Sequence, residues 1–463
     1  MNSSLVSRRF ARWMCATLAC FAFVALVARS RGAAATARME EIVQEKVAAR
    51  QFTGAVLVAK RGEVIFDRAY GLADLEWDVA NTTDTHFRIG SITKQFTAVC
   101  ILLLEERGKL KLTDPVSAHV PDAPAAWSQI TLHHLLTHTS GLSNVTSDPE
   151  FFLWKSQPAT VRQMVGRFRD QPLDFPAGTR FAYSNSNYLV LGLIVETLAG
   201  QSFGDFLREA VLDPLGLKET GVDSNSRILP RRARGYELSR GEIFNASYSH
   251  MSVPHAAGAI YSTTHDLRRW AEAIFGDQLL TAASRAKLLT PAQDGYALGV
   301  RVYDSFGRKL IEHGGAIAGF SSFLGHYPNE GLTIVVLSNL ETRSTAKLGQ
   351  ELAQAVLDPG AAAAHEAKAA AVALTVPTAT LEAYCGVYEM RPGMTNTIRL
   401  VDGQLTTQLT GQRPATLAPE SETKFVLKEV NAYVEFHRAE NGRATHLTMY
   451  QSGRTRKIPR ISD

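Results

Sequence analysis

The sequence predicts an α+β fold followed by a small antiparallel β-barrel-like domain. Strand-like segments lie near both ends of residues 38–357, and mainly helical segments lie between them. This order is typical of a domain in which distant parts of the chain form one antiparallel sheet beside a helical lobe. After an alanine-rich stretch, residues 377–463 change to short alternating strands separated by turn signals. We therefore expect a sheet flanked by helices, a helical lobe and a separate C-terminal domain.

The N-terminus has the layout of a secretory signal peptide. Arg8, Arg9 and Arg12 precede an apolar run over residues 13–27, and small residues follow it up to residue 37. The run is short for a transmembrane helix, which needs about 20 apolar residues. An uncleaved membrane anchor is the alternative. We expect residues 1–37 to be removed and the remaining chain to be periplasmic or secreted.

Removal of residues 1–37 changes the charge of the chain. It takes away five arginines and no acidic residue, so the formal net charge falls from +4 to −1. A nearly neutral chain gives no reason to expect a nucleic-acid partner or stable membrane insertion after cleavage. Cys100 and Cys385 remain, which are too few for a disulfide framework.

The first domain begins with a predicted β-hairpin and a buried helix. Strand-like residues on both sides of Arg61-Gly62 predict a hairpin over residues 54–72. Residues 91–107 are apolar almost all round, which is typical of a buried helix, and Gly108 is a natural stop. Further along, we expect a mainly helical stretch and then three strands, over residues 129–220, 299–303, 320–326 and 332–337.

The end of the chain contains a predicted linker and a β domain. Residues 358–376 are alanine-rich and most simply form a linker, or a last helix that continues into one. In the domain that follows, Asp402-Gly403 is a hairpin turn signal. The expected strand pairs are 397–401 with 405–409, and 424–430 with 433–437.

The strongest chemical signal is Ser91-Ile92-Thr93-Lys94. A serine hydroxyl is a weak nucleophile and needs a nearby base. Positions i and i+3 of a helix share a face, so the Lys94 amine can reach the Ser91 hydroxyl. Desolvation would lower the pKa of this amine and let it accept or relay the serine proton. Such a pair is common by itself and gains weight only from two later motifs.

The second motif is Tyr183-Ser184-Asn185, which follows a turn over residues 176–178. A phenol can act as a general acid or base where a neighbouring cation lowers its pKa. From an extended loop, the Asn185 amide could point the same way and bind a substrate carbonyl. The alternative is a packed loop tyrosine beside a turn-capping asparagine.

The third motif is His313-Gly314-Gly315-Ala316, just before a predicted strand. Two glycines let the backbone approach a ligand closely. The Ala316 N–H could then join the Ser91 N–H as an oxyanion hole. The alternative is a tight turn with an incidental histidine.

Taken together and in this order, the three motifs resemble those of the serine β-lactamase and penicillin-binding-protein superfamily, in its class C-like branch. The resemblance covers about residues 38–357 and implies a β-lactamase/DD-peptidase-like fold. Residues 377–463, which begin with Tyr384-Cys385-Gly386-Val387-Tyr388, are similar to a lipocalin-like domain appended to some members. Further segments that are similar to the family are residues 87–90, 135–142, 213–216 and 257–263.

The resemblance implies a role for each motif residue. Ser91 resembles the acylated nucleophile, Lys94 the amine that activates it, and Tyr183 a partner in proton transfer. Asn185 matches a residue that contacts the substrate amide. Which group takes the first proton is disputed in related enzymes.

His313 stands where many relatives have lysine. A histidine is mostly neutral at pH 7 and is only a modest donor. Its presence is more similar to the pattern of DD-peptidases, D-aminopeptidases and esterases than to that of dedicated class C β-lactamases. The resemblance places His313, Gly315 and Ala316 beside the substrate.

Two other patterns suggest different chemistry. Gly200-Gln201-Ser202-Phe203-Gly204 matches the nucleophile elbow of α/β-hydrolases, but a helix-length stretch precedes it where that elbow needs a strand. Ser202 is better placed as an N-cap for residues 203–212. His134 and His138 have a metal-ligand spacing without a companion ligand. We expect them to be structural, and we expect no metal and no cofactor.

These observations predict an exported serine hydrolase that works through a covalent acyl-enzyme on small amides or esters, namely D-amino-acid peptides, esters or β-lactams. One alternative is a penicillin-binding-like sensor whose serine is acylated but not released. Another is a dedicated class C-like β-lactamase. The expected partner is a small-molecule or peptide substrate, and the C-terminal domain could also cover the cleft or build oligomers.

Overall fold

The computed structural model describes nine stretches of the chain, which divide into two compact units between residues 359 and 360. The predicted signal peptide lies outside these stretches except for residues 32–37, which belong to a helix over residues 32–48. The interior of the predicted linker also lies outside them. The described residues are 32–239, 241–342, 344–358, 376–391, 394–410, 414–427, 432–440, 442–451 and 454–462.

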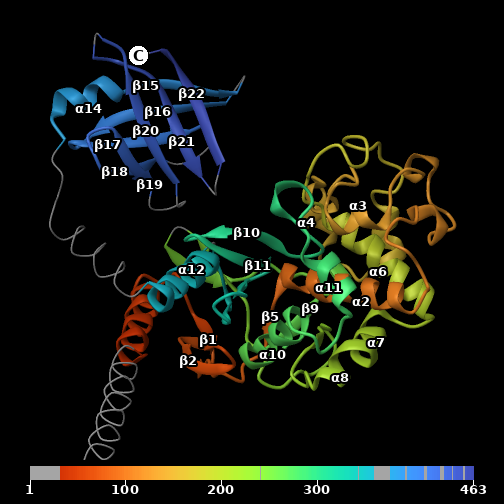
Figure 1. Cartoon of the computed structure of the whole chain (residues 1–463). Coiled ribbons are helices and arrows are strands. Elements are labelled where there is room, and N and C mark those ends of the chain that lie inside the picture. The colour runs from red at the N-terminus through yellow and green to blue at the C-terminus, as the bar shows by residue number, and fades with distance from the viewer. Residues whose placement is uncertain are drawn as a thin grey trace, which may run out of the picture. The chain divides into compact units, whose positions relative to one another are not determined.

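A six-stranded antiparallel sheet forms the centre of the first unit (Figure 1). The N-terminal hairpin pairs through β1 with β13, a strand almost 280 residues later in the chain. The predicted α+β fold is therefore confirmed. In spatial order the strands are β10 (Arg301–Ser305), β11 (Arg308–Ile317), β12 (Phe320–Tyr327), β13 (Leu332–Ser338), β1 (Gly54–Lys60) and β2 (Glu63–Tyr70).

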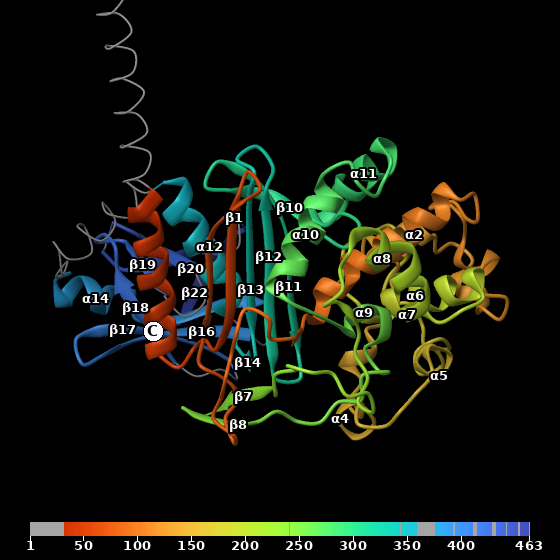
Figure 2. The same cartoon turned by 90° about the horizontal axis from the view of Figure 1, so that it is seen from below.

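Helices cover both faces of this sheet (Figure 2). Val56 and Val58 of β1 pack in a cluster with the helix over residues 32–48 and with α12 (Ser344–Leu357). Ala55 and Leu57 point the other way, into the cluster of α10 (Thr264–Phe275) and the helical lobe. Side chains alternate between the faces of a strand, so β1 is apolar throughout because both of its faces are buried.

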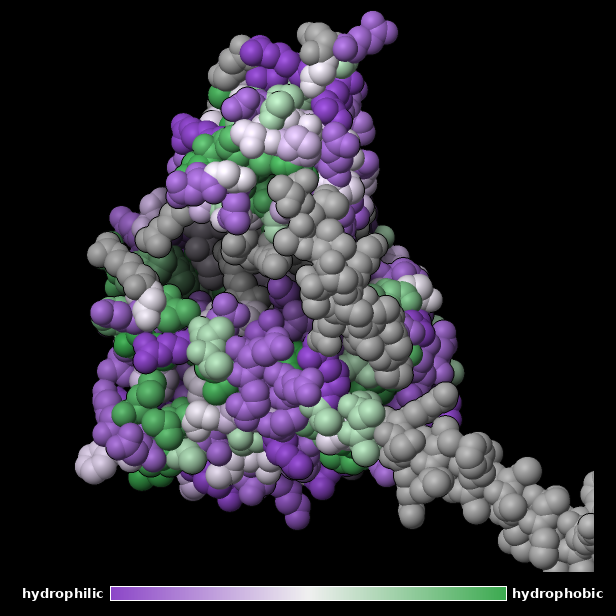
Figure 3. Space-filling model, turned by 90° about the vertical axis from the view of Figure 1, so that its left-hand side faces the viewer, coloured by the Kyte–Doolittle hydropathy of each residue, from purple (hydrophilic) through white to green (hydrophobic). Residues whose placement is uncertain are grey.

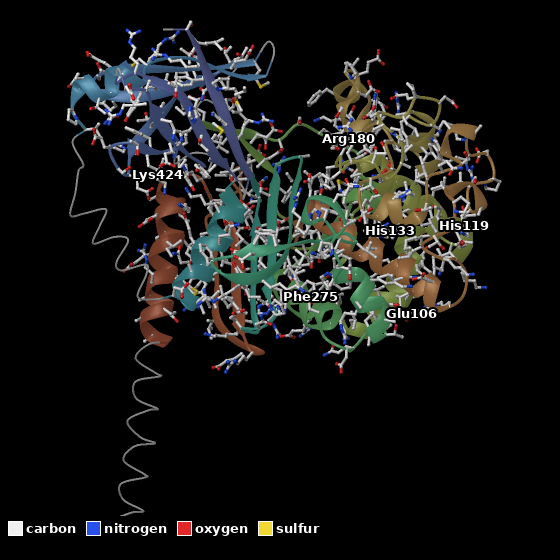
Figure 4. The ribbon with its side chains drawn as sticks, turned by 45° about the horizontal axis from the view of Figure 1, so that its top comes forward. Glu106, His119, His133, Arg180, Phe275 and Lys424 are labelled. Atoms are coloured by element: carbon white, nitrogen blue, oxygen red, sulfur yellow. The ribbon has the colours of Figure 1, made fainter. Side chains whose placement is uncertain are left out.

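The helical lobe is built around the helix that the sequence predicted to be buried. The predicted buried helix is α2 (Thr93–Glu106), which follows a 3-10 turn, η1 (Gly90–Ile92). At the end of α2, Glu106 (Figure 4) accepts hydrogen bonds from Thr281 N and Oγ1 at 3.0 and 2.8 Å, which ties it to α11. The other α-helices of the lobe and its surroundings are α3 (Leu132–Leu136), α4 (Phe151–Trp154), α5 (Val161–Gly166), α6 (Asn185–Ala199), α7 (Phe203–Leu207), α8 (Asp213–Leu215), α9 (His255–Gly258) and α11 (Ala282–Leu289).

Short elements connect these parts. One three-stranded sheet, β14–β7–β8, lies beside the cavity described below, and β5–β9–β6 and β3–β4 form two more small sheets. Their bounds are β3 (Leu72–Asp74), β4 (Val79–Ala80), β5 (Phe87–Arg88), β6 (Gly221–Val222), β7 (Tyr236–Ser239), β8 (Glu242–Asn245), β9 (Ile260–Ser262) and β14 (Leu340–Glu341). The short 3-10 and π turns are η2 (Val116–Ala118), η3 (Ala125–Trp127), η4 (Val145–Ser147), η5 (Arg208–Leu212) and η6 (Gln293–Gly295).

The second unit is a closed eight-stranded antiparallel barrel preceded by α14 (Thr378–Tyr384). Its first and last strands pair with each other, which closes the barrel, and both predicted strand pairs are present. Apolar side chains from α14 and the strands fill its interior. The strands are β15 (Gly386–Arg391), β16 (Met394–Val401), β17 (Gln404–Leu409), β18 (Ala415–Pro419), β19 (Lys424–Leu427), β20 (Ala432–Arg438), β21 (Ala444–Gln451) and β22 (Arg454–Ser462).

Several smaller sequence predictions can be compared with the structure. Ser202 caps α7, accepting a hydrogen bond from Asp205 N at 3.1 Å, as expected. Cys100 and Cys385 are free cysteines.

On the face shown in Figure 3, hydrophilic residues are interspersed with smaller hydrophobic groups, which is ordinary for a protein surface.

Among the described residues, no single helix has the length and apolar composition needed to cross a membrane. The pair Asn185–Ala199 and Phe203–Leu215 passes that test only when taken together, and it is bent by 78°.

Candidate active site

Ser91 lies in the 3-10 turn that leads into α2, and a glycine permits this position. Gly90 has φ +51°, and a Cβ on it would lie 2.8 Å from Ala316 N. Gly315 is equally constrained, because a Cβ there would lie 2.0 Å from Ile89 O. Ser322 Oγ also donates a hydrogen bond to Ile89 O at 2.8 Å. The two glycines thus let β11 lie directly against the turn that carries Ser91.

The Lys94 amine is buried one helical turn after Ser91, and its contacts assign its hydrogens. It lies 2.9 Å from Asn185 Oδ1, 2.7 Å from Ala257 O and 3.1 Å from Ser91 Oγ. An amide oxygen and a carbonyl oxygen can only accept, so a neutral amine donates both of its hydrogens to them. Its lone pair then remains for the Ser91 hydroxyl.

The environment of Lys94 favours this neutral form. The side chain is fully buried, and no carboxylate in the described part of the chain pairs with it. Desolvation therefore lowers the pKa of Lys94 well below its usual range. The sequence-based expectation for this amine agrees with the structure.

The pKa of Tyr183 is not lowered overall by a neighbouring cation, the condition under which this phenol could act as a general acid or base. Its ring centre lies 4.9 Å from Lys94 Nζ. Burial raises the pKa of the phenol above its usual value, and this effect exceeds the opposing effects of its hydrogen bond with Ser91 and the charge of Arg301. Tyr183 is consequently a protonated phenol that contacts the serine.

Asn185 is the first residue of α6 and does not lie in an extended loop. Its side-chain oxygen accepts from Lys94, and its Nδ2 donates to Thr146 Oγ1 at 3.2 Å. Its backbone N–H donates to Asn144 Oδ1 at 3.0 Å. The amide therefore orients the lysine in addition to lining the cavity.

His313 lies inside strand β11, where the sequence suggested residues before a strand or a tight turn. Both ring nitrogens are used. Nδ1 is 2.6 Å from Gly314 O, which can only accept, so Nδ1 carries the hydrogen and Nε2 accepts from Tyr296 OH at 2.9 Å. Burial lowers the pKa of His313 to about 3. His313 is thus neutral and has no donor left for a substrate in this arrangement, contrary to the modest donor expected.

His138 and Tyr296 lie near Tyr183, but they were not among the site residues predicted from the sequence. The His138 ring lies 4.3 Å from the Tyr183 ring and 4.7 Å from that of Tyr296. Its Nδ1 accepts from Ser184 N and Asn187 Nδ2 at 3.2 and 3.1 Å, so it positions the tyrosine motif. Burial lowers the pKa of His138 well below its usual range.

The two histidines with metal-ligand spacing serve different purposes. His134 Nδ1 accepts from Thr131 N and completes the capping box of α3, whereas His138 follows the helix at φ +57°. His133, which Figure 4 labels, directly precedes His134 in α3. In the described part of the chain no group of three or more His, Cys, Asp or Glu side chains could hold a metal ion.

A cavity of about 570 Å³ opens beside Ser91. Asn185 and Ala316 lie in its wall next to the serine, together with Leu189 and Ala257. Its size is within the range of about 300–1,000 Å³ typical of ligand sites. The structure therefore brings Ser91, Lys94, Tyr183, Asn185 and β11 together at one end of a ligand-sized pocket.

Comparison with known proteins gives two family matches. Residues 39–357 match the model of the Beta-lactamase family, and residues 370–458 match a domain of unknown function, DUF3471. Among curated proteins, the chain is 28% identical over 439 residues to penicillin-binding protein 4* of Bacillus subtilis, covering 87% of this chain and 94% of the relative.

Solved structures agree with these matches. A penicillin-binding protein from Bacillus halodurans is 28% identical, with a TM-score of 0.62 over 69% of this chain and 98% of that one. D-amino acid amidase from Ochrobactrum anthropi is 25% identical, with a TM-score of 0.62 over 70% and 99%. An octameric penicillin-binding protein homologue from Pyrococcus abyssi shares the fold over 91% of this chain and 99% of that one, with 23% identity and a TM-score of 0.65.

Proposed function

The chain belongs to the Beta-lactamase family of serine hydrolases, and from that premise we propose that Ser91 hydrolyses small amides or esters through a covalent acyl-enzyme. The observation that carries the proposal is the Lys94 amine. Its two hydrogens are directed at Asn185 and Ala257, and its lone pair is directed at Ser91 Oγ, 3.1 Å away. A buried neutral amine in this position is a base for the serine.

In the proposed reaction, Ser91 Oγ attacks the substrate carbonyl carbon while Lys94 accepts the serine proton. The carbonyl oxygen becomes an oxyanion held by the Ser91 and Ala316 backbone N–H groups. The protonated Tyr183 phenol donates a proton to the leaving group, which departs as an alcohol or amine. Water then attacks the acyl-enzyme and gives a proton to the Tyr183 phenolate, while Lys94 returns its proton to Ser91 Oγ and the acid is released.

The substrate classes considered are D-amino-acid peptides, esters and β-lactams. His313 lacks the permanent charge of a lysine, which favours the peptidase and esterase side of the class C-like branch over a dedicated β-lactamase. One solved relative is a D-amino acid amidase, which supports amide hydrolysis here. We also propose that the chain is exported and that its C-terminal barrel is lipocalin-like in shape, with a packed interior.

Substitution Ser91→Ala tests the proposal. We expect wild type to turn over an ester panel and to be labelled at Ser91 by a fluorophosphonate or penicillin probe, and the variant to lose both. Unchanged turnover in the variant would overturn the assignment of Ser91. A second measurement, intact-protein mass against time, separates the enzyme from the sensor alternative, because a stable adduct that never decays would favour the sensor.

A further inference from the structure

We propose that the cavity beside Ser91 is the acyl pocket and selects an uncharged, apolar acyl group of medium length. The inference rests on the proposed function, since it concerns the substrate of the same serine.

The position of the cavity indicates which half of the substrate it takes. Ser91, Asn185 and Ala316 line it, whereas Tyr183 and His313 are not among the described residues of its wall. In the proposed reaction the leaving group must lie on the Tyr183 side, where it receives a proton. The part of the substrate that stays bound to the serine therefore occupies the cavity.

The walls of the cavity are mainly apolar. They come from the helical lobe, from the segment before α9 and from the end of β11, so they surround a ligand on several sides. Apolar groups that leave water for such a wall gain binding free energy in proportion to their area. The apolar wall residues are Val145, Phe151, Phe152, Met164, Leu189, Leu238, Val253, Pro254, Ala257, Ala316, Ile317 and Ala318.

The charged residues of the wall already have protein partners. Lys155, which is 9% exposed, donates from Nζ to Ser247 Oγ at 2.7 Å. Ser247 in turn donates from N and Oγ to Glu237 Oε1 at 3.0 and 3.1 Å. Glu341 accepts from Gly319 N at 2.9 Å.

These contacts join the chain around α4 to the β7–β8 hairpin, and His250 N adds a hydrogen bond to Lys155 O at 2.8 Å. The polar groups therefore hold two walls of the pocket together. Because each already has a hydrogen-bond partner within the protein, a charged group on the ligand is not needed to pair with it.

The rim of the pocket offers a matched pair of residues for a test. Phe152 and Leu153 are adjacent on α4, and both are 74% exposed. Phe152 lines the cavity, with Lys155 Nζ 4.8 Å from its ring centre, whereas Leu153 is not among the wall residues. Replacement of either exposed side chain should leave the fold intact.

The experiment measures kcat/KM of the full chain for p-nitrophenyl esters with acetyl, butyryl, hexanoyl and octanoyl groups. A fully buried methylene is worth about a fourfold gain in kcat/KM, and partial burial should still give at least about a tenfold rise from acetyl to hexanoyl. A flat or falling series would overturn the inference. So would an ε-aminohexanoyl ester that reacts faster than the hexanoyl ester, because it would show a preference for a cationic end.

Variants place the selectivity in this cavity. We expect Phe152→Ala to lower the hexanoyl-to-acetyl ratio about 3- to 10-fold through loss of apolar contact, and Leu153→Ala to leave it unchanged. Ser249→Leu, which fills the cavity from its wall, should reduce hexanoyl turnover and keep acetyl turnover. Equal effects of Phe152→Ala and Leu153→Ala would count against the assignment.

The outcomes also separate this inference from the proposed function. Turnover without chain-length selectivity overturns the acyl pocket alone. Absence of turnover with every ester, together with an unlabelled Ser91, overturns the proposed function and this inference with it.

Discussion

The two units of the chain both have apolar cores, but they differ in the ionisable side chains that they bury. Around Ser91, the first unit buries Lys94, His138, His313 and Glu312, each of which could carry a charge. The barrel buries aromatic and aliphatic residues, and where these have hydroxyls they are satisfied locally. Tyr388 OH, for example, donates to Tyr384 O at 2.8 Å.

This difference indicates what each interior is for. Burial of an ionisable group costs free energy and shifts its pKa, so such groups persist mainly where a reaction uses them. The barrel interior is filled by apolar side chains that pack against one another. We infer that the chemistry belongs to the first unit alone, and the following predictions test that contrast.

The largest effect is expected at Lys94. Substitution Lys94→Met removes the lone pair directed at Ser91 and should lower kcat/KM for a good ester by about 10²–10⁴-fold, the usual contribution of a positioned base. In wild type, kcat/KM should fall as pH drops through the lowered pKa of Lys94, because protonation fills that lone pair. His313, whose pKa is about 3, cannot cause a limb above pH 5.

Burst kinetics with a chromogenic ester, measured from pH 5 to 9, check this prediction. Lys94→Met should remain folded, since methionine fills the same buried volume, although the loss of the donor to Asn185 Oδ1 and Ala257 O should cost about 1–3 kcal/mol of stability. A variant that keeps wild-type turnover and its acid limb would remove Lys94 from the reaction.

The matching substitution in the barrel should have the opposite result. The Phe436 ring stacks on Tyr384 at 4.3 Å and also packs against Phe425. Phe436→Ala should destabilise the barrel by about 3–5 kcal/mol through the cavity it leaves. Ester turnover should stay within about twofold, because each unit has its own core.

Chemical unfolding followed by fluorescence and by activity checks this result. Val401→Ala is the control, because Val401 is a half-exposed residue of the barrel. If Phe436→Ala removes activity while the first unit remains folded, the two interiors are coupled and the contrast between them is lost.

A third prediction concerns Glu312, a buried carboxyl group that has no role in the proposed reaction. Glu312 precedes His313 in β11, and burial raises its pKa from 4.5 to about 7, although Arg301 opposes this. The folded carboxyl holds a proton that the unfolded one releases, so stability falls as pH rises from 4.5 through 7. Glu312→Gln removes that loss and should stabilise the protein at pH 8 by roughly 3 kcal/mol.

Urea unfolding of wild type and Glu312→Gln at pH 4 and pH 8 tests this sign. The two proteins should be similarly stable at pH 4 and should diverge at pH 8. A variant that is less stable at pH 8 would mean that the carboxylate is paired in the folded state.

The site shows how far the sequence carries such arguments. The spacing of Ser91 and Lys94 predicted that the two side chains meet, since one helical turn fixes their distance. The roles of these residues stay predictions. The strand β11 was missed because Gly314 and Gly315 are unfavourable in strands. Gly315 is required by contact with Ile89, which lies more than 200 residues away in the chain and leaves no local pattern.

The direction of the Tyr183 pKa could not be predicted from the sequence. A neighbouring cation would lower it, but packing from distant segments makes burial the larger effect. The contacts of His138 and Tyr296 with Tyr183 were not predicted, because only the fold brings both rings against Tyr183. Local spacing thus predicts pairs within one turn, and long-range burial decides how they titrate.

The smallest effect is expected at Tyr296, where positioning and chemistry can be separated. Its hydroxyl donates to His313 Nε2 at 2.9 Å, and the ring is fully buried. Tyr296→Phe leaves that nitrogen without its partner and should cost about 1–3 kcal/mol of stability. Because Lys94 keeps its own contacts, we expect kcat/KM to fall by less than about tenfold. Tyr327→Phe is the control, since that buried phenol is hydrogen-bonded to Ser305 Oγ, 3.3 Å away. If Tyr296→Phe alone lowers kcat/KM by more than about a hundredfold at unchanged stability, well above the usual loss from a positioning residue, then His313 and Tyr296 take part in proton transfer, and the reactive part of the buried polar group extends from Ser91 along β11.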